Sequence, residues 1–183
     1  MIKQPHTTPS PILQSSEPLS IVQLSLVADE IAEDMRQYRP EFDSLLRLHR
    51  RSGCRVKELF QPTRWEVTSS TIVKITPQKG NAARHVRLAD IGFADAAAFS
   101  VVLADMARLP LRQYERAFSE VVKQKGLYRL YENGFASPST HFFRHVKIKE
   151  LAAEGQTHEQ ISLWIGEKNV QNLDYYLNSL YFL

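Results

Sequence analysis

The sequence predicts a mainly helical α+β domain with one small antiparallel sheet inserted early in the chain. Apolar residues recur at helical spacing before residue 60 and after residue 95. Between residues 65 and 88, β-branched and aromatic residues instead gather in short runs that turn residues separate. The length of 183 residues and the hydrophobic share of 43% are those of one globular domain, and they exclude a wholly disordered or a fibrous chain.

The start of the chain is expected to be an arm followed by helices. Residues 1–20 contain four prolines and many serines and threonines, which predicts a flexible N-terminal arm and places the domain at residues 21–183. Beyond the arm, an apolar stripe, a helix-opening proline and Gly53 as a helix stop divide the sequence into segments. The helices expected here cover Ile21–Met35, Pro40–Arg51 and Arg55–Phe60.

Two or three short antiparallel strands are expected next, with Pro77–Asn81 as the tip of a hairpin. The residues that indicate these strands are Trp65 and Val67, then Ile72, Val73 and Ile75, then Val86 and Leu88. After Asp90 the apolar spacing is helical again. The helices expected in this second half cover Asp95–Arg108, Leu111–Gln124, Thr140–Glu154, His158–Ile165 and Asn169–Leu180.

Composition narrows the class of function. The chain carries 23 Lys and Arg against 20 Asp and Glu, and its pI is about 9.0, which permits an anionic partner without requiring one. It has no run of 18 apolar residues and no signal peptide in its first 20 residues, and the single Cys54 cannot form an internal disulfide; we therefore expect a cytoplasmic protein. Neither a phosphate-binding glycine loop nor a Cys/His zinc pattern occurs, so no cofactor or metal is expected.

Five short segments carry the residues suited to chemistry, and they are informative only together. An arginine opens a helix in SGCRVKEL, a lysine lies in the hairpin PQKGNAARHVRL, and a histidine and an arginine share one helix face in THFFRHV. The segment SLWIGEKNVQNLDYY follows. The candidate site residues are Arg55, Lys79, His141, Arg144, Glu167 and Tyr176, with 24 residues from Arg55 to Lys79, 23 from Arg144 to Glu167 and 9 from Glu167 to Tyr176.

In order and spacing these segments resemble the catalytic domain of the tyrosine recombinases, or phage integrases, over about residues 22–183. That family has a first arginine box, a hairpin lysine, an HxxRH box, an LGH box and a nucleophilic tyrosine. The resemblance implies a helical bundle with a small three-stranded antiparallel sheet. Only the arm precedes the catalytic region. The chain therefore resembles the single-domain members of the family, such as the fimbrial-switch invertases.

The resemblance also implies the reaction. The Tyr176 hydroxyl would attack a DNA phosphodiester and form a 3′-phosphotyrosyl link, with Arg55 and Arg144 on the non-bridging oxygens. Lys79 would protonate the leaving 5′-oxygen, and His141 would be the base. The expected partner is double-stranded DNA, bound by a multimer of chains that are monomeric alone. Integration, excision and inversion stay open as outcomes, in a mobile element, a phage or an inversion switch, and a partner recombinase or accessory protein is a further option.

Glu167 departs from the family pattern, which usually has His at this place. A carboxylate about 4 Å from the phosphate would cost roughly 4 kcal/mol at an effective dielectric of 20, or nearly three orders of magnitude in rate. This cost shrinks if Glu167 points away or pairs with an arginine. The alternative function is therefore a catalytically impaired DNA-binding or regulatory protein on the same fold. Tyr175 competes with Tyr176 as nucleophile, but the spacing favours Tyr176 and assigns Tyr175 to the core.

Overall fold

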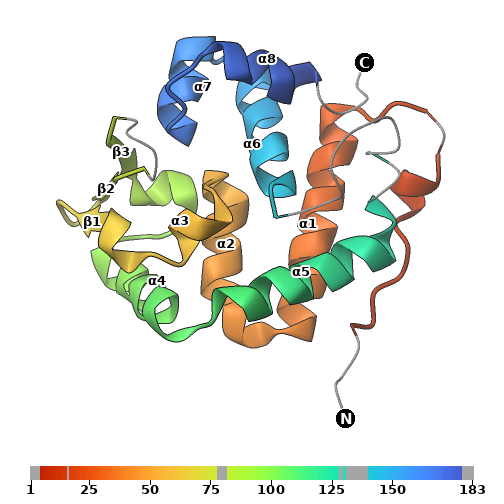
Figure 1. Cartoon of the computed structure of the whole chain (residues 1–183), viewed down its shortest axis with the longest axis horizontal. Helices are drawn as coiled ribbons and strands as arrows, with labels where there is room; N and C mark the ends of the chain where they lie inside the picture. The colour runs from red at the N-terminus through yellow and green to blue at the C-terminus, as the bar shows by residue number, and fades with distance from the viewer. Residues whose placement is uncertain (1–4, 16, 78–81, 128–129, 131–139, 179–183) are drawn as a thin grey trace.

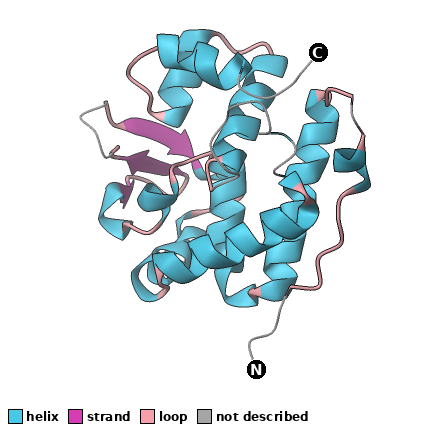
Figure 2. Cartoon of the chain, turned by 45° about the vertical axis from the view of Figure 1, so that its right-hand side comes forward, coloured by secondary structure: helices cyan, strands magenta, loops and turns pink. Residues whose placement is uncertain are grey.

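The computed structural model describes residues 5–15, 17–77, 82–127, 130 and 140–178. It confirms a mainly helical fold with a three-stranded antiparallel sheet at one side (Figures 1 and 2). Helix α6 runs through the middle, with α7 and α8 together above it (Figure 1). The helices are α1 (Ile21–Tyr38), α2 (Asp43–Ser52), α3 (Val56–Leu59), α4 (Ala96–Arg108), α5 (Leu111–Lys125), α6 (Phe142–Ala153), α7 (His158–Ile165) and α8 (Gln171–Asn178), and the strands are β1 (Trp65–Val67), β2 (Ile72–Ile75) and β3 (Arg84–Arg87).

Helix α1 is capped at its start and buries one stripe. Ser20 accepts a hydrogen bond from the backbone of Gln23, and the Gln23 side chain accepts one from the backbone of Ser20, so two N–H groups at the helix start are satisfied. The helix runs past the predicted end to Tyr38, because the residue that precedes Pro40 is the first that the proline forces out of helical geometry. The buried stripe is Leu24, Val27, Ala28, Ile31 and Met35.

Gly53 ends α2 and allows the next segment to lie against α6. Its φ of 63° is left-handed, which glycine adopts without strain. A Cβ at this position would lie 2.8 Å from the Cβ of Lys147 on α6, closer than side-chain carbons approach. The glycine therefore brings the start of α3, where Arg55 is the N-cap, close to α6.

The sheet has the order β1-β2-β3, with both pairs antiparallel. Val73 on the central strand pairs with Val67 on one side and Val86 on the other, and it is fully buried. The prediction of Leu88 as a strand residue is wrong, because β3 ends at Arg87 and Leu88 begins a 3₁₀ turn. The predicted hairpin tip falls mostly on residues 78–81, which lie outside the described residues.

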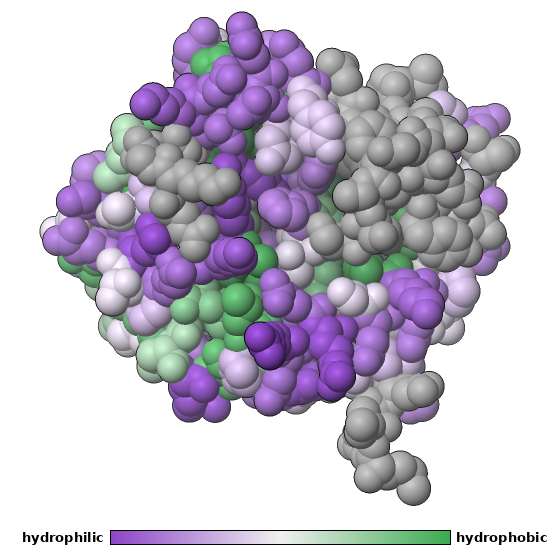
Figure 3. All heavy atoms as spheres, viewed as in Figure 1, coloured by the Kyte–Doolittle hydropathy of each residue, from purple (hydrophilic) through white to green (hydrophobic). Residues whose placement is uncertain are grey.

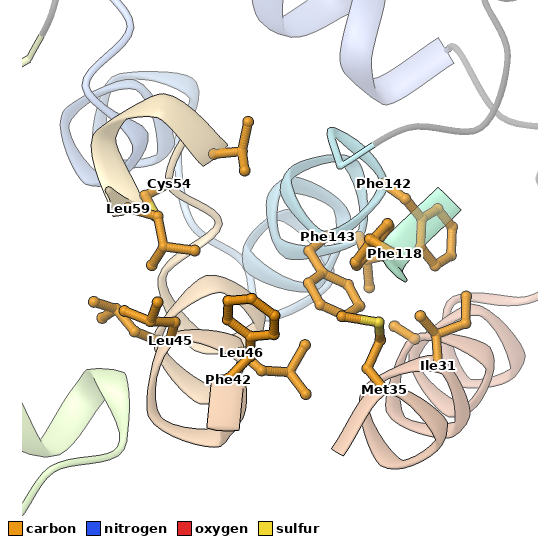
Figure 4. Close-up of a cluster of buried hydrophobic side chains, with 14 of the residues drawn as sticks. Ile31, Met35, Phe42, Leu45, Leu46, Cys54, Leu59, Phe118, Phe142 and Phe143 are labelled. Carbon is orange, nitrogen blue, oxygen red and sulfur yellow. The ribbon is translucent and has the colours of Figure 1, made fainter. Parts of the chain in front are cut away.

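Two hydrophobic clusters lie inside the described part of the chain. The larger one joins the sheet to α1, α2, α4, α5 and the first half of α6. Figure 4 shows part of it, where Met35 of α1, Leu46 of α2 and Phe143 of α6 point toward one another. The smaller cluster lies between α6, α7 and α8, and the partly buried Trp164 packs against both clusters. The buried members of the smaller cluster are Ile148, Leu151, Ile161, Ile165 and Leu173.

The N-terminal segment differs from a free arm within its described part. Leu13 and Leu19 are buried in the larger cluster, and the backbone N–H of Ser10 donates to the carbonyl of Lys125 at 3.1 Å. Apolar residues between the prolines give this segment surface to bury, which the proline count alone did not indicate. Its mobility and the boundary at residue 20 stay predictions. Among the described residues, no helix has the length and apolar character needed to cross a membrane.

Candidate active site

Two of the predicted arginines meet at one carboxylate. Arg55 caps the start of α3, Arg144 lies in the first turn of α6, and Glu167 follows Gly166, the C-cap of α7. Glu167 Oε2 lies 3.0 Å from Nη2 of Arg55 and 3.9 Å from Nη2 of Arg144. A single anionic oxygen thus lies between guanidinium groups that come from distant segments, which is an arrangement suited to a phosphate oxygen.

Arg144 is fully buried, and the backbone fixes it. Its Nη1 donates to the carbonyls of Gly53 and Ile165, both at 3.1 Å, so the ends of α2 and α7 hold the side chain in place. Its Nε and Nη2 have no hydrogen-bond acceptor among the described residues. Burial and the positive charge of Arg55 lower the pKa of Arg144. Tyr176 acts in the opposite direction and raises this pKa through its hydroxyl, so the guanidinium of Arg144 faces both Tyr176 and Glu167.

Arg55 is oriented by Glu58, one turn further along. Oε2 of Glu58 accepts the backbone N–H of Arg55 at 3.1 Å, and Oε1 lies 3.7 Å from Nη1 of Arg55. The Glu58 side chain is completely buried, and its backbone carbonyl accepts a hydrogen bond from Trp65 Nε1 of β1 at 2.8 Å. Glu58 thus holds Arg55 in position at the start of α3.

Glu167 turns toward the arginines. Its backbone N–H donates to the carbonyl of Ser162, and the Ser162 hydroxyl donates back to the Glu167 carbonyl at 2.6 Å, which fixes the backbone after Gly166. Asn172 Nδ2 donates to Glu167 Oε1 at 3.3 Å, while Oε2 pairs with Arg55. The next residue, Lys168, is exposed, and it is Glu167 that contacts Arg55.

Helix α8 presents Tyr176, and not Tyr175, to this group. The Tyr176 ring lies 5.7 Å from the Arg144 guanidinium carbon and packs edge-on against His145 at 4.9 Å between ring centroids. Tyr175 is 56% exposed, so its predicted place in the core is wrong. The two rings contact each other at 5.6 Å between centroids, and Tyr175 lies further from His145, at 6.3 Å. The lysine Lys149 on α6 holds this helix by donating to the carbonyl of Leu177 at 2.6 Å.

The two remaining predicted site residues are His141 and Lys79. His141 is the N-cap of α6, one turn before Arg144, and its side chain is in part open to solvent. Partial loss of solvent around its ring and the positive charges of Arg144 and Arg55 lower the pKa of His141, which favours the neutral imidazole that a base requires. Lys79 lies outside the described residues.

Arg84, the first residue of β3, belongs to the same group of charges, and the sequence analysis did not assign it. Only 2% of it is exposed, and its Nη2 lies 3.7 Å from Oε2 of Glu58. Its guanidinium lies against Gly166, where an added Cβ would overlap Nη1 of Arg84. The signal in the sequence was its place in PQKGNAARHVRL, five residues after Lys79, where its burial could not be foreseen.

The fold is that of the catalytic domain of tyrosine recombinases and integrases. The chain is similar to XerA recombinase, with a TM-score of 0.55 at 17% identity over 90% of this chain and 60% of that chain. It is also similar to a lambda integrase dimer bound to a COC′ core site, with a TM-score of 0.61 at 14% identity over 89% of this chain and 48% of that chain. A second such dimer, of lambda integrase(75-356), gives a TM-score of 0.61 at 15% identity over 89% of this chain and 59% of that chain.

The chain thus spans between half and three fifths of the length of the solved proteins that it matches. No family model matches the sequence, and no curated protein matches it. The structural likeness, at these identities, concerns the fold.

Proposed function

We propose that the chain is a site-specific DNA recombinase that cuts and rejoins DNA through a 3′-phosphotyrosyl intermediate. The observation that carries this proposal is the convergence of Arg55 and Arg144 on one anionic oxygen, with the Tyr176 ring against Arg144. The lambda integrase structures that the chain matches contain a DNA core site, which supports double-stranded DNA as the partner. The protein would act as a multimer on paired sites of a mobile element, a phage or an inversion switch.

The proposed reaction gives each of these residues the role that the family resemblance implies. Arg55 and Arg144 bind the two non-bridging oxygens and stabilise the charge that grows on them in the transition state. The Tyr176 oxygen bonds to phosphorus and gives its proton to His141, while the bond from phosphorus to the 5′-oxygen breaks. Lys79 supplies the proton that the 5′-oxygen takes up. A 5′-hydroxyl later reverses these steps on another strand, so the bond energy is conserved and no nucleotide is consumed.

A phosphate oxygen that takes the place between Arg55 and Arg144 must displace the Glu167 carboxylate. Pairing with Arg55 at 3.0 Å reduces the repulsion that a free carboxylate would exert on a phosphate, but this ion pair has to break before the phosphate binds there. That requirement favours a second candidate function, a DNA-binding or regulatory protein in which catalysis is impaired. The two candidates share the fold and the DNA partner. They differ in whether the phosphate displaces the carboxylate.

Covalent capture tests the first candidate without knowledge of the target site. The probe is a library of nicked duplexes with a randomised central segment, and the readout is a DNA adduct that survives SDS. We expect an adduct whose DNA remnant maps, after tryptic cleavage at Lys168 and fragmentation, to Tyr176. Salt-sensitive binding of the same duplexes without any adduct would contradict the recombinase and support the second candidate.

Replacing Glu167 by glutamine is expected to raise the rate of adduct formation between tenfold and about a thousandfold. Glutamine keeps the size of the side chain and its contact with Asn172 but removes the negative charge that competes with the phosphate. Single-turnover rates on a captured duplex measure the change. Glu159→Gln on α7, which makes the same change of charge at an exposed position, serves as the control and should match the wild type. A slower Glu167→Gln enzyme would show that the carboxylate assists the reaction.

A further inference from the structure

Arg84 is a buried cation whose donors are not used. Its Nε, Nη1 and Nη2 are all out of contact with solvent and have no hydrogen-bond acceptor among the described residues. Its nearest anion, Glu58 Oε2, lies at 3.7 Å, beyond hydrogen-bond distance, and the same oxygen already accepts the backbone N–H of Arg55. Buried guanidinium groups without acceptors are costly, and they occur where a ligand will supply the acceptor.

The charges around Arg84 do not balance. Three guanidinium groups, those of Arg55, Arg84 and Arg144, share two carboxylates, those of Glu58 and Glu167. One of the three guanidinium charges is therefore not neutralised by a carboxylate. A phosphodiester, which carries one negative charge, would neutralise it.

Cys54 does not supply the missing negative charge, although it lies near the same arginines. Burial, together with Glu58, raises the pKa of its thiol to about 12, and Arg84 and Arg144 act against this shift without overcoming it. The thiol is therefore neutral at physiological pH. Burial and the charges of Arg144 and Arg55 also lower the pKa of Arg84.

The place of Arg84 relative to Glu167 connects it to the same group of charges. Its guanidinium lies against Gly166, and Glu167 is the next residue. The residue whose carboxylate lies between Arg55 and Arg144 is thus the immediate neighbour of the glycine that lies against Arg84. The upper part of the molecule, where α7 carries this turn, is mainly hydrophilic on the face seen in Figure 3.

We propose that Arg84 is a third phosphate-binding arginine of this site, which donates to the oxygens of a phosphodiester once the phosphate has displaced Glu167. It would supply the donor that the family takes from the residue at position 167. This inference rests on the proposed function for the identity of the natural ligand. The chemistry of the ligand, a tetrahedral phosphate, is inferred from the buried donors alone.

A purely structural Arg84 makes a different prediction. If its ion pair with Glu58 held the fold together, then removing it would lower the melting temperature in the absence of any anion. If its donors await a ligand, then Arg84→Gln should melt at the same or a higher temperature, because a buried charge without acceptors is removed and Glu58 keeps Arg55. The stability of the free protein therefore separates the two roles.

The experiment compares Arg84→Gln with Arg87→Gln. Both residues lie on β3 and both variants lose one positive charge, but Arg87 is exposed and pairs with Asp90. The first readout is the rise in melting temperature with inorganic phosphate at constant ionic strength, in the wild type and in a Glu167→Gln background. The second is the affinity for a short DNA duplex. We expect phosphate and duplex to bind at least about tenfold more weakly to Arg84→Gln, and unchanged to Arg87→Gln.

Each outcome decides the inference. Equal phosphate binding by Arg84→Gln and wild type would overturn it, even if Tyr176 forms an adduct and the recombinase stands. Lost phosphate binding without any DNA adduct in the wild type would support Arg84 and remove the recombinase. If duplex binding falls but phosphate binding does not, then Arg84 contacts DNA elsewhere and the inference fails.

A second variant covers the case in which Arg84→Gln does not fold. Arg84→Lys keeps the charge but offers a single point of donation in place of the planar fork. We expect it to fold and to bind phosphate several-fold more weakly than the wild type. Wild-type phosphate binding by Arg84→Lys would overturn the assignment of the guanidinium as a ligand.

Discussion

Tyr176→Phe is expected to form no SDS-resistant DNA adduct, a loss of more than about a thousandfold in rate. Phenylalanine keeps the ring that lies 5.7 Å from the Arg144 guanidinium and packs against His145, so α8 should stay in place. Only the oxygen that would bond to phosphorus is removed. Salt-dependent DNA affinity should therefore match the wild type, and covalent capture on duplex DNA together with a binding titration measures both quantities.

Tyr175→Phe is the matched control for this experiment. Tyr175 is the immediate neighbour of Tyr176 on α8 and carries the same hydroxyl, but it is 56% exposed. Removal of the Tyr175 hydroxyl should therefore leave the amount of adduct unchanged. Retention of the adduct by Tyr176→Phe would show that another residue is the nucleophile. Loss of the adduct in Tyr175→Phe alone would mean that α8 turns by about one residue when DNA binds.

Acid should unfold the protein through a buried histidine beneath the site. His49 on α2 is fully buried, its Nδ1 lies 2.8 Å from the Tyr114 hydroxyl, and burial, with the positive charge of His141, lowers its pKa from 6.5 to about 3. Between these pH values the unfolded chain binds a proton that the folded chain excludes. The free energy of unfolding therefore falls as the pH falls through this window, by roughly 2–3 kcal/mol between pH 7 and pH 4.5.

His145 on α6 adds a second such group. Burial and the charges of His141 and Lys149 lower its pKa to about 3 as well. The two histidines together remove about 5 kcal/mol between pH 7 and pH 4.5. Because a domain of this size has a total stability of about 5–15 kcal/mol, the loss brings it close to unfolding.

Urea unfolding at pH 7 and pH 4.5 measures this prediction. The test variant is His49→Phe combined with Tyr114→Phe, since the double change removes both partners of the buried hydrogen bond. We expect the loss of stability between the two pH values to shrink by about half, that is by roughly 2–3 kcal/mol. His85→Gln, at an exposed position of β3, should leave the loss unchanged. An undiminished loss in the double variant would assign the acid sensitivity to other groups.

The sequence was sufficient to predict the fold, because each element depends on local signals. Gly53 ends α2 as expected, and α7 has the predicted bounds His158–Ile165. The β-branched residues in Ile72–Ile75, bounded by turn residues, were enough to identify this strand. Leu88 was misassigned because an apolar residue that continues a strand pattern can equally be buried in the turn that follows.

Motif spacing could identify candidate site residues, but it could not predict the contacts among them. Motif spacing identified Arg55 and Arg144, and the structure brings them together at Glu167. No spacing rule shows that a carboxylate lies between them, since this depends on how α7 packs on α6. The burial of Arg84 against Gly166 could not be predicted for the same reason, because the contact joins residues that lie far apart in the sequence.

The division of the interior into two clusters ties together the two groups that must change places. Glu167 and Tyr176 both belong to the layer formed by α7 and α8. This layer is held to α6 by the smaller cluster and by the contact of Lys149 with Leu177, and to the end of α2 by the hydrogen bond from Trp164 to the Ser52 carbonyl. Arg55 and Arg84 belong to the larger body. A displacement of this layer that withdraws the carboxylate would also shift the tyrosine relative to the arginines. If the chain acts as proposed, the free energy that positions Tyr176 is therefore partly the free energy that keeps Glu167 between the arginines, and contacts that strengthen one would strengthen the other.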